Sequence, residues 1–175
     1  LDSFEVVAEV IDFAPPHEEV QSVRFDKNIA YVCTSIELSD PVFFFDLCDL
    51  SNITYKDTGT IDGYSTSLIN LGNGYLLGIG VGDRWGSFKV EVYEESENGV
   101  RSVSAYELAN AYYSTDYKSY YIDRQNQLIG LAVSDYQGVR YIVLHFDGYD
   151  LTELISVPFD ISVRTTDNTR GVYID

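Results

Sequence analysis

The segment from Ser65 to Leu108 carries four strand patterns in a row, each bounded by residues that favour turns. Glycine and asparagine tolerate the positive φ of tight hairpin turns, so the clusters between the strands fit antiparallel connections. Those clusters are Gly72-Asn73-Gly74, Gly82–Gly86 and Ser96–Gly99. The expected strands are Thr66–Leu71, Tyr75–Val81, Phe88–Glu95 and Val100–Leu108. The segment therefore predicts a four-stranded antiparallel sheet.

Similar four-stranded patterns lie on both sides of this segment. Before it, the expected strands are Val20–Phe25, Ile29–Ile36, Val42–Leu47 and Thr54–Ile61. After it, they are Tyr117–Ile122, Leu128–Ser134, Val139–Phe146 and Leu151–Phe159. The second strands begin at Ile29, Tyr75 and Leu128, at intervals of 46 and 53 residues. Repeats of this length are typical of β-propeller blades, and helical periodicity is almost absent, apart from a turn of helix that 110–116 could hold.

The fold class that follows is all-β, a partial β-propeller of three complete four-stranded antiparallel blades plus flanking single strands. Residues 1–175 are expected to form a fragment of one propeller domain, with blades at about 20–61, 65–108 and 117–159. Phe4–Phe13 and Arg170–Ile174 read as extra strands of neighbouring blades. Because closed propellers have typically about four to eight blades, we expect open, apolar blade faces. Those faces predict self-association, or a parent chain that completes the ring.

Two stretches indicate close packing between sheets. Val42–Leu47 reads VFFFDL, nearly continuous in apolar residues, which is typical of a strand covered on both faces. Gly78, Gly80 and Gly82 fall on one face of one strand, where each lacks a side chain to pack. We expect aromatic side chains from Val42–Leu47 or Tyr117–Tyr121 to fill that space. A dinucleotide-binding loop is disfavoured, because GIGVGD lacks the third glycine of that motif and no helix follows.

Charge and composition narrow the partners. The chain has 11 Lys and Arg against 28 Asp and Glu, a formal net charge of −17. This charge repels nucleic acids and anionic membrane surfaces, and allows basic proteins or cations. No apolar run approaches the roughly 20 residues of a membrane helix. The chain begins at Leu1 and contains no Met, so we expect a processed product or a piece of a longer chain whose export signal lies elsewhere.

Motifs for catalysis are absent from the sequence. His17 and His145 are far apart, and His145 lies in an alternating strand that favours a structural role. No nucleophile elbow, Walker loop or HExxH is present. The Asp-rich turns at 26–28 and 123–126 leave a bound cation such as calcium open, although turn chemistry explains them equally well. We therefore predict no catalytic residues and no required cofactor.

The two cysteines raise the possibility of a disulfide. If Ile29–Ile36 and Val42–Leu47 form a hairpin that pairs Leu38 with Phe43, Cys33 lies opposite Cys48. Cross-strand pairs of this kind are close enough for a disulfide. Neighbouring registers are also compatible with the sequence, and they leave two buried thiols instead.

A binding site, if present, is expected on one rim of the propeller. Propeller ligands usually bind where the loops between second and third strands meet the loops between blades. The first set of loops contains Asp40, Asp83, Arg84, Trp85, Asp135, Tyr136 and Gln137. The second set adds His17, Glu18, Tyr64, Tyr112, Tyr113 and Asp116. Carboxylates beside aromatic rings suit cations, basic proteins or sugars. The alternative is that these are ordinary polar turn residues, with Trp85 half buried.

Between Val23 and Gly82, the runs RFDKNIAYV, SDPVFFFDL and LGNGYLLGIGVGD resemble bacterial secreted proteins with a C-terminal β-propeller domain. The resemblance continues to the final RGVYID, whereas Cys33 and Cys48 stand where the family would have small or apolar residues. It implies a propeller at the cell surface or beyond, with no established enzymatic activity. The leading hypothesis is thus an extracellular, non-catalytic binding or scaffold module for a protein, glycan or cation. The alternative is a glycan hydrolase whose active site is completed by missing blades. A purely structural spacer comes third.

Overall fold

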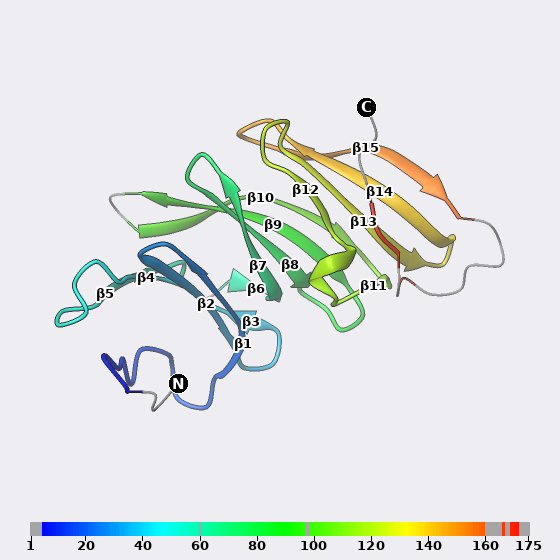
Figure 1. Ribbon diagram of the computed structural model, residues 1–175. Helices are drawn as coiled ribbons and strands as arrows, with labels where there is room; N and C mark the ends of the chain where they lie inside the picture. The colour runs from blue at the N-terminus through cyan, green and yellow to red at the C-terminus, as the bar shows by residue number, and fades with distance from the viewer. Residues whose placement is uncertain (1–4, 60, 97–98, 160–165, 167–168, 172–175) are drawn as a thin grey trace.

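The computed structural model describes residues 5–59, 61–96, 99–159, 166 and 169–171. Three large antiparallel sheets stand side by side in chain order (Figure 1). The first sheet contains β1 (Glu19–Asp26), β2 (Ile29–Ser35), β4 (Val42–Asp46) and β5 (Thr54–Asp57). The second contains β7 (Tyr64–Gly72), β8 (Tyr75–Val81), β9 (Phe88–Ser96) and β10 (Gly99–Leu108). The third contains β11 (Tyr112–Tyr113), β12 (Tyr121–Asp123), β13 (Leu128–Asp135), β14 (Gly138–Phe146) and β15 (Leu151–Pro158). Two short strands, β3 (Ser39–Asp40) and β6 (Ile61–Asp62), pair with each other beside the first sheet.

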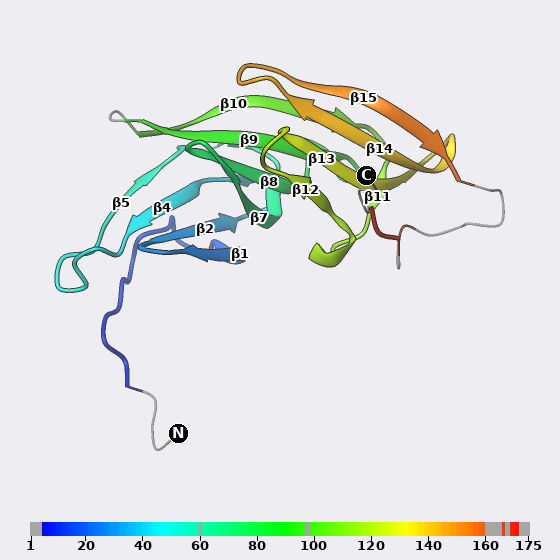
Figure 2. The ribbon, with the colours of Figure 1, turned by 45° about the horizontal axis from the view of Figure 1, so that its top comes forward.

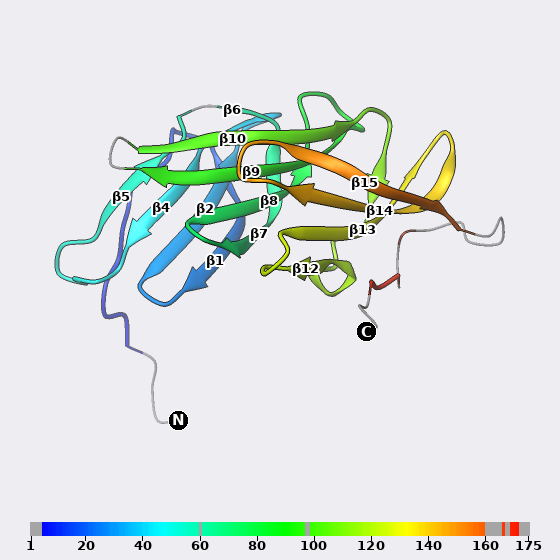
Figure 3. The same cartoon turned by 90° about the horizontal axis from the view of Figure 1, so that it is seen from above.

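Each sheet runs from an inner strand to an outer strand in chain order, so the sheets fan out from one side of the molecule (Figures 2 and 3). The inner strands of the first two sheets, β1 and β7, lie against each other.

The inner edge of the third sheet differs from its predicted single strand Tyr117–Ile122. A 3-10 helix, η1 (Tyr117–Ser119), interrupts this edge, because the side chain of Asp116 caps it by accepting from the Lys118 N–H at 3.0 Å. The helical turn thus follows the segment 110–116 in which it was predicted.

The second and third sheets enclose the largest apolar core. β8 and β9 contribute Leu77, Ile79 and Val90, and the third sheet contributes Leu131 and Ile142, all fully buried. These residues alternate along their strands with residues of the opposite face, as the pleat of a strand requires. None of the described residues belongs to a helix that is long and apolar enough to span a membrane.

The first sheet is covered on both faces, as VFFFDL predicts. Val42 and Phe44 pack toward the second sheet. Phe43 and Phe45 pack on the opposite face, where each ring meets Phe13 edge-on at 5.1 Å between centroids. The covering element on that face is therefore the N-terminal segment and not another sheet.

Among the described residues, neither of the strands predicted at the chain ends is found. Residues 5–13 form no strand, because this segment packs its apolar side chains, Val10 and Phe13 among them, onto the first sheet without backbone pairing to it. Of the segment 170–174, residues 170 and 171 form no strand and 172–174 lie outside the described residues. On the far face of the third sheet, Ile155 and Val157 are each about half exposed, at 49% and 52%.

The possible disulfide between Cys33 and Cys48 does not form in this structure. β2 and β4 pair in a register that places Cys33 opposite Val42, and Cys48 lies beyond the end of β4. Cys33 is fully buried and Cys48 is exposed, and they are not bonded. The register differs because Ser39–Asp40 leaves the hairpin to pair with Ile61–Asp62, which makes the connection between β2 and β4 longer than a tight turn.

Candidate functional site

Strand β9 has one apolar face and one polar face, both buried. Phe88, Val90 and Val92 point into the core shared with the third sheet. Lys89 and Glu91, with Tyr93, alternate with them and are also buried. We call Lys89, Glu91 and Tyr93 the polar ladder. It lies between the first and second sheets, where charged groups are costly unless they are paired.

Gly78 and Gly80 of β8 lie beside the polar ladder, where a larger residue would not fit. Gly78 pairs with Glu91, and Gly80 pairs with Lys89, in the register of β8 and β9. A Cβ at Gly78 would lie 2.8 Å from the Tyr93 ring, and one at Gly80 would lie 1.8 Å from the carbonyl oxygen of Tyr64. The close packing predicted at these glycines is therefore present, but it lies within the second sheet and not between two sheets. The space is filled by Tyr93 and by neighbouring β7, not by the aromatic segments that the sequence suggested.

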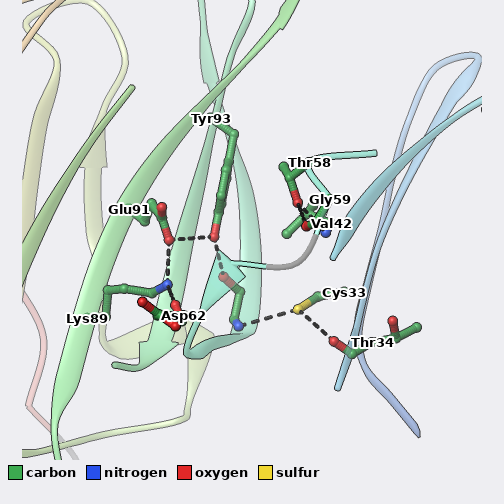
Figure 4. A network of polar contacts seen from close by, with 10 residues as sticks. Cys33, Thr34, Val42, Thr58, Gly59, Asp62, Lys89, Glu91 and Tyr93 are labelled. Atoms are coloured by element: carbon green, nitrogen blue, oxygen red, sulfur yellow. Dashed lines mark hydrogen bonds and ion pairs between the residues drawn. The ribbon is translucent and has the colours of Figure 1, made fainter. Parts of the chain in front are cut away.

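The members of the polar ladder satisfy one another (Figure 4). The Lys89 ammonium lies 2.5 Å from the Glu91 Oε2 atom and also donates to the carbonyl oxygen of Asp62. The Tyr93 hydroxyl donates to the same Glu91 oxygen at 2.9 Å. Burial, reinforced by the negative charge of Glu91, raises the pKa of Tyr93 well above its ordinary value. The tyrosine thus remains a hydrogen-bond donor to the carboxylate.

A chain of further polar contacts links the polar ladder to the first sheet. The Tyr93 hydroxyl lies 3.3 Å from the Ser65 Oγ, and the Ser65 N–H donates to the Cys33 Sγ at 3.4 Å. The Cys33 thiol donates in turn to the Thr34 carbonyl oxygen at 3.7 Å, as Figure 4 shows. The Thr34 hydroxyl donates to the carboxylate of Glu18. Polar contacts therefore run across the whole interface and end at the segment that leads into β1.

A pocket of about 320 Å³ opens where these contacts reach the surface. We call it the rim pocket, and its main side chains are His17, Glu19, Ile36, Glu37, Tyr64 and Trp85. Several residues that line the rim pocket are neighbours in sequence of residues that make these polar contacts. His17 and Glu19 flank Glu18, and Tyr64 precedes Ser65. The polar contacts thus involve the chain neighbours of three residues that line the pocket.

Trp85 is the most accessible aromatic wall of the rim pocket, with 74% of its surface exposed. Its loop is held from below: the Ser87 N–H and Oγ both donate to the Arg84 carbonyl oxygen, at 3.0 and 2.6 Å. The Gly86 carbonyl oxygen accepts from the Ala111 N–H at 2.9 Å. Trp85 is therefore exposed on a loop held by hydrogen bonds. The alternative interpretation, in which Trp85 was an ordinary half-buried turn residue, expected less exposure.

Asp83, Asp135 and Tyr136, which were also predicted at the rim, do not line the rim pocket. Asp83 pairs with its neighbour Arg84 at 3.3 Å on the surface. Asp135 is nearly buried and pairs with Arg140 at 2.9 Å, which explains it structurally. Tyr136 is 87% exposed at the tip of its hairpin and accepts from Gln137 at 2.9 Å. The backbone of Asp40 pairs with Ile61.

Three further rim residues from the between-blade loop also lie outside the rim pocket. Asp116 caps η1, Tyr112 is exposed, and Tyr113 is partly buried with its hydroxyl 3.0 Å from the Thr66 hydroxyl. The rim pocket instead adds Glu19, Gln21 and Glu37, which sequence reasoning missed. Glu37 adopts a positive φ of 62°, so it marks a turn that a glycine or asparagine would have signalled more clearly.

The family comparison agrees with the arrangement of the three sheets. A family model described as "Beta propeller domain" matches residues 1–169. The chain belongs to the β-propeller domain family. Its three sheets are three blades, and the resemblance to propeller proteins is confirmed. The rim pocket lies between the first and second blades, on the face where propeller loops gather.

The chain is also similar to the uncharacterized protein MJ1554 of the archaeon Methanocaldococcus jannaschii. The two are 33% identical over 105 residues, which are 59% of this chain. The matched region makes up 16% of that protein, so the propeller chain spans only a small part of its relative's length. A bacterial source and secretion remain predictions.

A few carboxylates of the propeller have a shifted pKa, in one of two directions. Asp123 and Asp147, in exposed turns, have a lowered pKa because they accept hydrogen bonds within those turns. Near the rim, burial raises the pKa of Glu107, while the Lys89 ammonium opposes the shift.

Among the described residues, no group of three or more His, Cys, Asp or Glu side chains is arranged to hold a metal ion. Turn hydrogen bonds account for Asp123, whose two oxygens accept from Gln125 and Asn126 at 2.7–3.0 Å.

Proposed function

We propose that this chain is a non-catalytic binding module of an extracellular β-propeller protein. Its rim pocket would bind a cationic side chain from a basic segment of a protein partner. Membership of the propeller family supports a binding or scaffold role, and the resemblance to secreted proteins supports the location. The glycan hydrolase alternative gains no support from the comparisons.

The observation that carries the proposal is the meeting of an exposed indole with two carboxylates in one pocket. Trp85 contributes an exposed indole, a group whose ring face attracts ammonium and guanidinium groups. Glu19 and Glu37 add negative charge, and the pocket lining contains no Lys or Arg to neutralise them. The net charge of −17 would also draw basic partners toward the protein at low ionic strength.

Binding of a short Lys-rich peptide tests the proposal by calorimetry at low ionic strength. We expect Trp85→Ala to weaken binding about tenfold, equivalent to about 1.4 kcal/mol. Tyr149→Ala is the matched control, because Tyr149 is 80% exposed on a turn at the opposite end of β14. It should bind as the wild type does.

The charge of the ligand provides the second arm of the test. Acetylation of the peptide lysines removes their positive charge and should abolish binding. If the acetylated peptide binds equally well, or if Trp85→Ala leaves the affinity unchanged, the rim pocket does not recognise cations. Saturable binding of neutral oligosaccharides instead would assign the rim to glycans.

A further inference from the structure

A second pocket, of about 460 Å³, lies on the inner strands of all three blades. We call it the axial pocket, and it shares no residue with the rim pocket. β1 contributes Arg24, β7 contributes Ser67 and Ile69, and β12 with the turn after it contributes Ile122 and Arg124. Because inner strands of successive blades face a common axis, the three blades converge on this one space.

The charge of the axial pocket is opposite to that of the whole chain. Its lining contains two arginines and no Asp or Glu, although acidic residues outnumber basic residues 28 to 11 in the sequence. Within the described part of the chain, ion pairs involve Lys56, Arg84, Lys89, Arg101 and Arg140. Arg24 and Arg124 take part in none of those pairs. Neither guanidinium group is therefore neutralised by a carboxylate of the described residues.

Arg124 is positioned by the backbone of the neighbouring blade. Its Nε donates to the Asn70 carbonyl oxygen at 2.7 Å, which ties the third blade to the end of β7. The bond uses one edge of the guanidinium and leaves the terminal nitrogens free of that contact. A planar group held in this way is suited to the two oxygens of a carboxylate or phosphate.

We propose that the axial pocket binds a small organic anion, with Arg24 and Arg124 pairing to its carboxylate or phosphate group. Ile69 and Ile122 offer an apolar surface for the carbon skeleton of the ligand, and Ser67 and Tyr117 offer hydroxyl groups. The volume is in the range of pockets that hold small molecules. The rim pocket would then bind cations and the axial pocket would bind anions.

Titration calorimetry of the whole chain with two anionic sugars and their neutral counterparts tests this proposal. The probes are galacturonate against galactose, and glucose 6-phosphate against glucose. At least one anion should bind saturably and its neutral counterpart should not, and the pair that binds identifies carboxylate or phosphate as the preferred group. Arg24→Gln and Arg124→Gln should each weaken binding about tenfold or more.

Arg101→Gln is the matched control, because Arg101 is exposed and pairs with Glu94 at 2.6 Å on the outer strands of the second blade. It should leave binding unchanged. Both axial arginines are exposed, so their variants should fold, which thermal unfolding checks. Absence of saturable binding of either anion to the wild type, or equal affinity in the Arg24→Gln, Arg124→Gln and wild-type proteins, would overturn the proposal.

Discussion

The two interfaces between neighbouring blades differ in the chemistry of the side chains that they bury. The interface of the second and third blades is a continuous apolar core, in which Leu131 and Ile142 are fully buried. The interface of the first and second blades contains apolar residues together with the Lys89–Glu91 pair and Tyr93. Strand β9 supplies side chains to both. Neighbouring blades thus stack through apolar side chains or through polar side chains that pair with one another. In this protein the polar interface lies beneath the rim pocket.

The largest effect is expected from removing one partner of the buried pair. Glu91→Leu would leave the Lys89 ammonium buried beside the Asp62 carbonyl oxygen alone, at a cost of about 3–5 kcal/mol in unfolding free energy. The double variant Lys89→Leu with Glu91→Leu should recover much of this loss, since no uncompensated charge remains. Urea unfolding measures both. Equal stability of the single and double variants would mean that the pair is not buried.

The apolar interface is expected to respond to loss of volume instead. Leu131→Ala should lower the unfolding free energy by about 2–5 kcal/mol, because the substitution leaves a cavity at a fully buried position. Peptide binding at the rim pocket should remain unchanged in the folded variant, because Leu131 belongs to the other interface. A parallel loss of peptide affinity would show that the two interfaces are coupled.

The two cysteines provide a matched comparison within the first blade. Cys33→Ala removes the sulfur that accepts from the Ser65 N–H in the polar interface, and we expect a loss of about 1–3 kcal/mol. Cys48→Ala alters an exposed side chain and should change stability by about 0.5 kcal/mol or less. Urea unfolding without reductant makes the comparison. Equal and large losses of unfolding free energy from both substitutions would indicate a disulfide between the two cysteines, because either substitution would break it.

The smallest effect concerns the turns at the end of the blades away from the rim. Asp147 accepts from the N–H groups of Asp150 and Tyr149, both at 2.8 Å, and these bonds lower its pKa. Its stabilising contribution is therefore complete above the unfolded pKa of about 3.9 and disappears as the pH falls through the lower folded value. Asp147→Asn should lose less stability than the wild type between about pH 5 and pH 2. An identical acid profile would exclude this contribution.

The strands of the second blade were predictable because their patterns are local. Tyr75–Val81 has the predicted bounds, since apolar residues and flanking glycines define both ends. The alternation at the N-terminus was misleading, because Val10 and Phe13 pack on the first blade without pairing as a strand. A hydrophobic pattern reports burial of one side, and it does not report a hydrogen-bonding partner. Self-association through exposed residues such as Ile155 remains a prediction.

The candidate site was predictable only in part. His17, Tyr64 and Trp85 were recognised as rim residues because they lie in loops that a propeller brings to one face. Glu19 and Glu37 were missed, since their approach to Trp85 depends on how the first two blades stack. The polar ladder was also missed. Its alternating residues in KVEVY appear half solvated in the sequence, and only the register opposite Gly78 and Gly80 explains their burial.

Binding of cations at the rim pocket can be observed directly through Trp85, the only tryptophan in the sequence. Its emission should change saturably as a short Lys-rich peptide is added at low ionic strength. The change should shift to about tenfold higher peptide concentration in the Glu19→Gln and Glu37→Gln variants, because each removes one charge from the pocket. Emission that stays constant while calorimetry detects peptide binding would place the site elsewhere and contradict the proposed function.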